Sequence, residues 1–67
     1  MTTTALRTEL ADLARSLSRA LSRLEAVETD RGLCPEARRL VGLIADDVEV
    51  ARDGLAALAR VRLEEYA

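Results

Sequence analysis

Two tracts of heptad-spaced aliphatic residues, separated by a short break, constrain the fold of this chain most. The first tract is Leu6, Leu10, Leu13, Leu17, Ala20, Leu24 and Val27. The second tract is Ala37, Val41, Ile44, Val48, Ala51, Leu55 and Leu58. Spacings that alternate between four and three residues place apolar side chains along one line of an α-helix, where a second helix can cover them. The pattern therefore predicts an all-α chain with two helices, each with one apolar seam.

The break between the tracts predicts a tight turn. Gly32 is suited to the left-handed conformation in which many helices end. Pro35 fits the first position of a new helix, where its missing N–H has no partner to lose, so Cys34 would lie just before that helix. A connection this short is typical of antiparallel neighbours.

These signals give a coiled-coil-like hairpin in a single domain, residues 1–67. We expect a first helix over about 4–31, with its N-cap among the threonines at 2–4, a turn over 32–34 and a second helix over about 35–65. Folding the chain at the turn makes neighbours of Leu24 and Val41, Leu17 and Val48, and Leu10 and Leu55.

Composition excludes several classes of function. The chain has no His and one Cys, so it lacks the donors for an ordinary zinc site or an intrachain disulfide. Its basic residues are all arginine, and with twelve acidic residues the net charge is −2, which argues against general attraction to nucleic acid or to an anionic membrane. No segment is apolar for long enough to span a bilayer. We therefore expect a cytoplasmic, non-enzymatic protein without a cofactor.

A hairpin of this length has little core, and chains this short usually need a disulfide, a metal or a partner. A second, weaker stripe along the second helix indicates where a partner would lie. Together with Leu40, the expected interface consists of Leu43, Val50, Gly54, Ala57 and Val61. A helix that is apolar on two sides is typical of a larger assembly.

The sequence therefore predicts a small interaction module. It would either pair with itself as a homodimer, giving a four-helix bundle, or dock on the helices of a larger protein as an accessory or regulatory subunit. In the first helix, Arg15, Arg19 and Arg23 form a basic row. In the second, Asp46, Asp47, Glu49 and Asp53 form an acidic stretch. One interpretation is that the two rows are complementary flanks that set the antiparallel register of the hairpin.

The alternative is that the row of Arg15, Arg19 and Arg23 binds an anion, a nucleotide or a nucleic acid. Cys34 is a second candidate, because a thiol at a helix N-terminus near arginines can be redox-sensitive or can link two chains. The plain interpretation of Cys34 is a small residue in a turn.

Two short stretches resemble known families. The segment from Leu6 to Leu10, followed by Leu13, resembles the first helix of helical chorismate mutases, which implies that its arginine would bind a substrate carboxylate. However, the chain has no Lys and lacks the third helix of that family. Asp12, Ser16 and Arg19 resemble part of a cyclic-dinucleotide motif in coiled-coil anti-sigma factors, which implies nucleotide binding. The later positions of that motif do not match.

Overall fold

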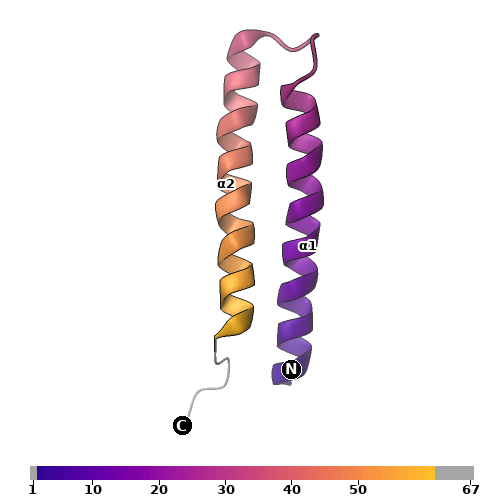
Figure 1. Cartoon of the computed structure of the whole chain (residues 1–67), viewed down its shortest axis with the longest axis vertical. Helices are drawn as coiled ribbons and strands as arrows, with labels where there is room; N and C mark the ends of the chain where they lie inside the picture. Colours follow the sequence, from indigo (N-terminus) through magenta and orange to yellow (C-terminus); the bar gives the residue numbers. More distant parts are fainter. Residues whose placement is uncertain (1, 62–67) are drawn as a thin grey trace.

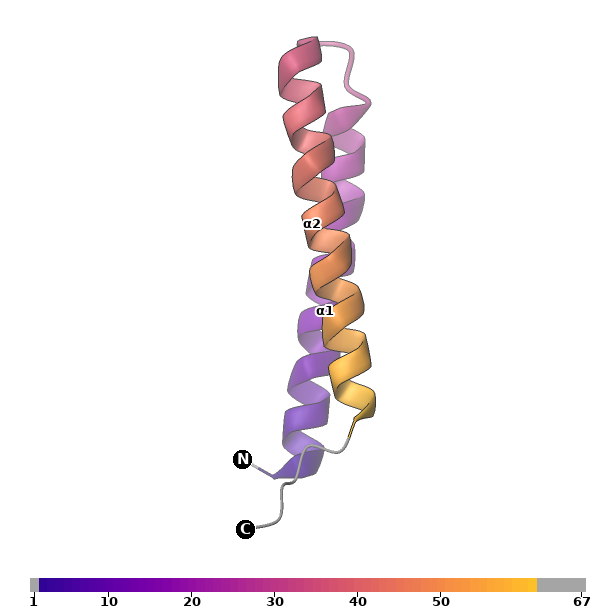
Figure 2. The same cartoon turned by 90° about the vertical axis from the view of Figure 1, so that its left-hand side faces the viewer.

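The protein is an antiparallel pair of α-helices. The structure, a computed structural model, describes residues 2–61. Helix α1 comprises Thr3–Glu28 and helix α2 comprises Pro35–Arg60. The two helices lie side by side along their whole length, with the turn at one end and the N-terminus beside the end of α2 at the other (Figure 1). Seen from the side, the helices cross at a shallow angle (Figure 2). The expected all-α hairpin is confirmed.

Both helices begin where the sequence predicts. The Thr2 hydroxyl accepts a hydrogen bond from the Ala5 N–H at 3.0 Å and so caps α1. Cys34 is the N-cap of α2 in an extended conformation, and Pro35 occupies the first turn, followed by Glu36. An acidic residue at this position interacts favourably with the positive end of the helix dipole.

The first helix ends earlier than expected, at Glu28 rather than near residue 31. The Thr29 hydroxyl donates to the Ala26 carbonyl oxygen, and an Asp30 carboxylate oxygen accepts the Gly32 N–H at 2.7 Å. Side chains of Thr and Asp compete with helical hydrogen bonds in this way, so the turn starts at Thr29. The expectation that Gly32 would be left-handed is wrong, because no residue in the described part of the chain has a positive φ.

The second helix also ends earlier than expected. It ends at Arg60 instead of near residue 65, because Val61 is extended, with φ −83° and ψ 170°. Residues 62–65 of the expected helix lie outside the described residues.

The two helices meet along a line that is rotated from the expected seams. The members that the expected and observed seams share are Leu10, Leu17, Leu24, Val41, Val48 and Leu55. The other members are replaced by the residue that follows each in the sequence: Arg7, Ala14, Leu21 and Glu28 in α1, and Arg38, Ala45, Arg52 and Ala59 in α2. This rotation puts small alanine side chains between the helices, where their backbones can come close together. It also places Arg7 and Arg38 in the seam, close to the ends of the helices.

The hairpin buries very little. Among the described residues only Leu21 and Ala45 are buried, each with 6% of its surface exposed. The sum of residue numbers at one level of the hairpin is close to 66, as the hydrogen bonds between Arg7 and Ala59 and between Arg38 and Glu28 show. The sequence-based pairings sum to 65, so the expected register is correct to within one residue even though the seams are rotated.

Candidate partner-binding face

The aliphatic residues that the rotation leaves out of the seams gather on one side of the hairpin. In both helices these residues lie on the same side of the seam, one position before a seam residue in the sequence. Because the helices face each other and run in opposite directions, the two rows lie on the same side of the hairpin. We call this side the apolar face; its members are Leu6, Leu13, Ala20 and Val27 of α1 and Ala37, Ile44, Ala51 and Leu58 of α2.

Four of the large residues of the apolar face are about half exposed. The exposed fractions are 45% for Leu13, 44% for Val27, 51% for Ile44 and 44% for Leu58, whereas Leu6 is less exposed. A shallow hollow lined by Ala20, Arg23, Leu24 and Val27 lies on the α1 side of the face. The hollow offers room there for side chains from another helix.

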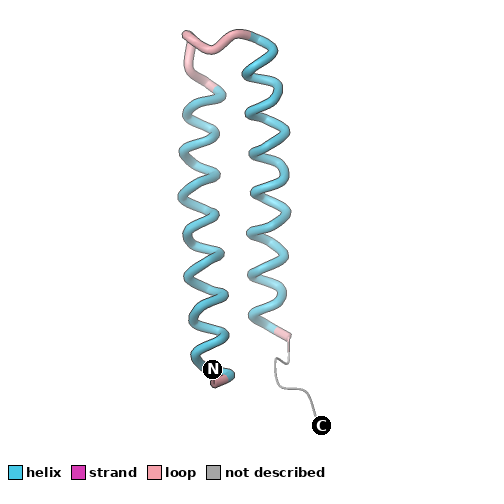
Figure 3. Tube along the Cα trace, turned by 180° about the vertical axis from the view of Figure 1, so that it is seen from behind, coloured by secondary structure: helices cyan, strands magenta, loops and turns pink. Residues whose placement is uncertain are grey.

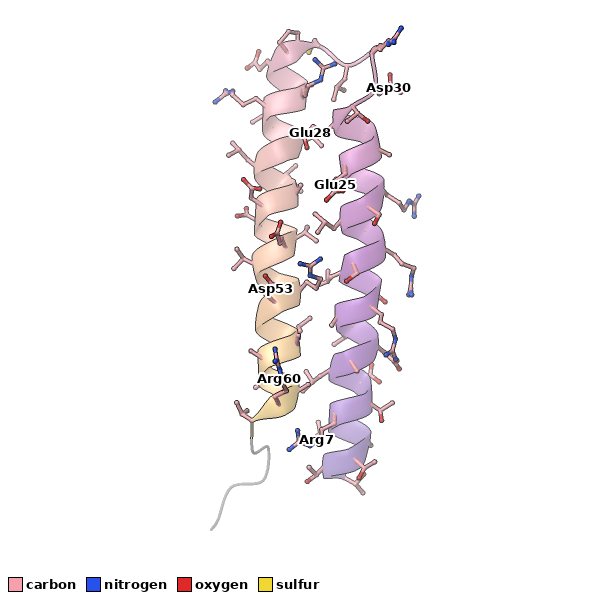
Figure 4. All side chains as sticks on the ribbon, in the orientation of Figure 1. Arg7, Glu25, Glu28, Asp30, Asp53 and Arg60 are labelled. Atoms are coloured by element: carbon pink, nitrogen blue, oxygen red, sulfur yellow. The ribbon has the colours of Figure 1, made fainter. Side chains whose placement is uncertain are left out.

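The opposite side of the hairpin is polar. Figure 4 shows Glu25 on the viewer's side of α1 and Asp53 on the viewer's side of α2. The apolar face is turned away in that view and is on the side from which Figure 3 looks at the molecule. The hairpin is thus amphipathic as a unit, and a partner would cover one side of it.

The partner interface expected from the sequence is divided by the structure. Leu40, Gly54 and Val61 form the row next to the apolar face, where Leu40 and Val61 are both 48% exposed. Leu43, Val50 and Ala57 form a row that points directly away from α1, and Val50 is 71% exposed. A flat partner cannot cover both rows together with Ile44 and Leu58. The first row belongs to the edge of the apolar face, and the second does not.

The charged rows do not pair with each other within the chain. Each of the two ion pairs in the described part of the chain joins residues of a single helix. Arg15 pairs with Asp12 in α1, and Arg52 pairs with Asp53 in α2 at 3.0 Å. Arg19 donates to the Ser16 hydroxyl at 3.2 Å, and Arg15, Arg19 and Arg23 are all exposed. No ion pair among the described residues joins the basic row to the acidic stretch, and the interpretation of complementary flanks stays a prediction.

Two arginines, Arg7 and Arg38, hold the ends of the hairpin together. The Arg7 guanidinium donates to the carbonyl oxygens of Ala59 and Val61, the latter at 2.9 Å. The Arg38 guanidinium donates to the carbonyl oxygens of Glu28, Asp30 and Leu33, at 2.8, 2.9 and 3.2 Å. A cation at these unpaired carbonyl groups is favourable both as a hydrogen-bond donor and against the helix dipole. The signal that could have revealed them is their position in the seam, which is visible only in the rotated register.

Removal of the Arg38 guanidinium should destabilise the hairpin. We expect Arg38→Met to lower the free energy of unfolding by about 1–3 kcal/mol, since three carbonyl groups lose a charged donor. The measurement is urea denaturation followed by circular dichroism at 222 nm. Arg39→Met is the matched control, because Arg39 is exposed and its guanidinium makes no hydrogen bond in the described structure. Equal stability of the two variants would contradict a clamping role for Arg38.

Cys34 is an exposed free thiol whose side chain makes no capping hydrogen bond. The described residues contain no group of side chains that could hold a metal ion. Neither α1 nor α2, as described, is long and apolar enough to cross a membrane. The main feature of the described geometry is thus its exposed apolar face.

Comparison with known proteins adds no further assignment, since no family model, curated protein or solved structure matches the chain.

Proposed function

We propose that the protein is a non-catalytic interaction module that docks its apolar face against other helices. The observation that carries this proposal is the contrast between the two buried residues, Leu21 and Ala45, and the four large aliphatic residues left about half exposed on one face. Contiguous apolar surface of this kind marks interaction sites in soluble proteins. The proposed partner completes a core that one hairpin builds only in part.

The gain from docking is substantial relative to the stability of so small a chain. Full burial of one Leu, Ile or Val side chain contributes about 1.5–3 kcal/mol, so covering the exposed half of each contributes about 1 kcal/mol. Small domains have net stabilities of only a few kcal/mol. Folding of the hairpin and docking of its apolar face are therefore coupled in this proposal.

Two forms of docking fit the face. In one, two hairpins pair into a four-helix bundle; in the other, a hairpin joins the helices of a larger protein as an accessory or regulatory subunit. Both forms use the same face and the same driving force, because α-helices pack at interaxial distances of 8–10 Å whichever chain supplies them.

Helix content and molecular mass should depend on concentration together. We expect the helical signal at 222 nm to fall as the purified chain is diluted from about 100 μM to about 1 μM, because dilution removes the partner that stabilises the helices. Sedimentation velocity over the same range should show the mass falling to that of one chain. A fully helical monomer at every concentration would contradict the proposal. A monomer with little helix would leave docking on a different protein as the form that applies.

A further inference from the structure

We propose that the occupant of the apolar face is a second copy of this chain, docked with both turns at the same end of a four-helix bundle. This inference rests on the proposed function and adds the identity and the direction of the partner. A two-fold axis parallel to the helices relates the copies, so α1 of each copy lies over α2 of the other. Closed two-fold symmetry of this kind is the commonest arrangement of homo-oligomers.

The first argument is the alternation of large and small side chains on the apolar face. At successive levels of the hairpin the paired members are Leu6 and Leu58, Leu13 and Ala51, Ala20 and Ile44, and Val27 and Ala37. The two-fold axis places α2 of the second copy at the same level over α1. Leu13 then packs against Ala51 of the second copy, Ile44 against Ala20 and Val27 against Ala37. At these three levels a large residue faces a small one, which fills the space between helices without overpacking, whereas at the fourth level Leu6 faces Leu58.

The second argument is charge. Between residues 13 and 24, α1 contains three arginines and no acidic residue, a net charge of +3. At the same level, between residues 42 and 53, α2 contains four acidic residues and one arginine, a net charge of −3. Arg15 and Asp53 are already paired with Asp12 and Arg52, whereas Arg23 and Asp47 lie next to the apolar face and have no ion pair in the described hairpin. In the proposed dimer the basic part of each α1 lies beside the acidic part of the other α2, twice by symmetry.

The reverse docking direction brings like charges together. If the turns lay at opposite ends, α1 would pack on α1 of the second copy, and α2 on α2, with their centres at the same level. Asp46, Asp47 and Glu49, which lie near the centre of α2, would then be at the level of the same residues of the other copy. Like charges at this distance are unfavourable, and unlike charges set the direction of paired helices. Three charged side chains of each sign lie around the turn, so two turns can meet without net repulsion. They are Glu28, Asp30 and Glu36, and Arg31, Arg38 and Arg39.

One residue pair on the edge of the face specifies the direction most directly. Arg23 of one copy and Asp47 of the other lie on adjoining edges of the two faces, at levels within reach of an extended arginine side chain. Arg23 also lines the hollow of the apolar face. In the reverse direction Arg23 would instead approach Glu9, and the two Asp47 side chains would approach each other.

The position of Cys34 allows a direct test in the full chain. It is the one cysteine, it is exposed, and it lies at the turn. A nitroxide label on Cys34 reports the distance between the two turns by pulsed electron–electron double resonance. In the proposed dimer the two Cα atoms are separated by about 15 Å, from interhelical spacings of 8–10 Å. In the reverse dimer the separation is about 45 Å, from the rise of 1.5 Å per residue.

Each result decides the proposal. A distance distribution centred below about 30 Å, which allows for the length of the labels, supports the proposed dimer. A distribution centred near 45 Å overturns the docking direction and leaves the proposed function in place. A monomer with little helix overturns the second copy as partner, again without contradicting the proposed function. A fully helical monomer overturns both.

Reversal of charges gives a second measurement that does not depend on the label. We expect Arg23→Glu to weaken the dimer about tenfold, because two attractive pairs become repulsive. Adding Asp47→Arg to the same chain should restore the dissociation constant to within about threefold of the original. Both side chains are exposed in the hairpin, so the fold of the single chain does not depend on them. If the second change gives no recovery, the proposed pairing of α1 with α2 of the other copy is overturned.

Discussion

Replacement of Leu21 with Ala is expected to lower the free energy of unfolding by about 2–5 kcal/mol, which is enough to unfold most of the chain at micromolar concentration. Among residues 2–61, Leu21 is the one large side chain that is buried, with 6% of its surface exposed. It packs at the level of Ala45, whose small side chain lets the two helices approach. Truncation would leave a cavity that the neighbouring backbone cannot close without separating the helices. The measurement is urea denaturation at one fixed protein concentration.

Leu43→Ala is the matched control for this change. It removes the same atoms from a helix interior, but Leu43 is 52% exposed and points away from α1. Replacing Leu with Ala does not lower helix propensity, so the control should stay within about 0.5 kcal/mol of the original chain. If Leu43→Ala destabilised the protein as much as Leu21→Ala, the row of Leu43, Val50 and Ala57 would be buried in the native assembly. The packing of α1 on α2 described above would then be incomplete.

The number of helices, their direction and their register could be predicted from the sequence, because each depends on local signals. Pro35 and Cys34 determine the start of α2, and Thr2 provides the cap of α1. The register follows from the length of the turn and from the position of the break. These features involve residues close together in the chain, where the chemistry of one side chain decides the backbone.

The rotation of the seams could not be predicted in the same way. The rotated seam contains charged residues in each helix, so the apolar heptad spacing favours Ala20 and Ile44 over Leu21 and Ala45 as the residues that face the other helix. The choice depends on contacts between distant residues: the closeness that Ala45 allows, and the hydrogen bonds of Arg7 across the helix ends. Spacing alone therefore assigns the whole apolar face to the core.

The same ambiguity explains what the sequence predicted about the binding face. The second stripe on α2 indicated correctly that this helix is apolar on more than one side. Half of the expected interface, Leu40, Gly54 and Val61, lies beside the apolar face. The sequence does not indicate the contribution of α1 to this face, because the heptad spacing assigns Leu13 and Val27 to the seam. Only the three-dimensional structure shows that rows from both helices meet on one side.

Ile44→Asp is expected to break the assembly, with a dissociation constant raised about 100-fold or more. By two-fold symmetry the change would put two carboxylates into an apolar interface, where an unpaired charge is costly to bury. Within one hairpin the new side chain can reach water, because Ile44 is 51% exposed there. The effect on mass should therefore exceed any direct effect on the contact between α1 and α2. Sedimentation equilibrium from about 1 to about 500 μM would give the dissociation constant.

Val50→Asp tests whether the effect belongs to the face or to the added charge. It lies in the same helix, also exchanges a β-branched residue for Asp, and is the most exposed large hydrophobic residue of α2, at 71%. Because Val50 points away from both α1 and the apolar face, its replacement should change the dissociation constant by less than about threefold, as expected for a surface site. The opposite result, in which Val50→Asp dissociates the assembly and Ile44→Asp does not, would place the partner on the row of Leu43, Val50 and Ala57. The apolar face would then be an exposed flank, and the rotation of the seams would have no role in assembly.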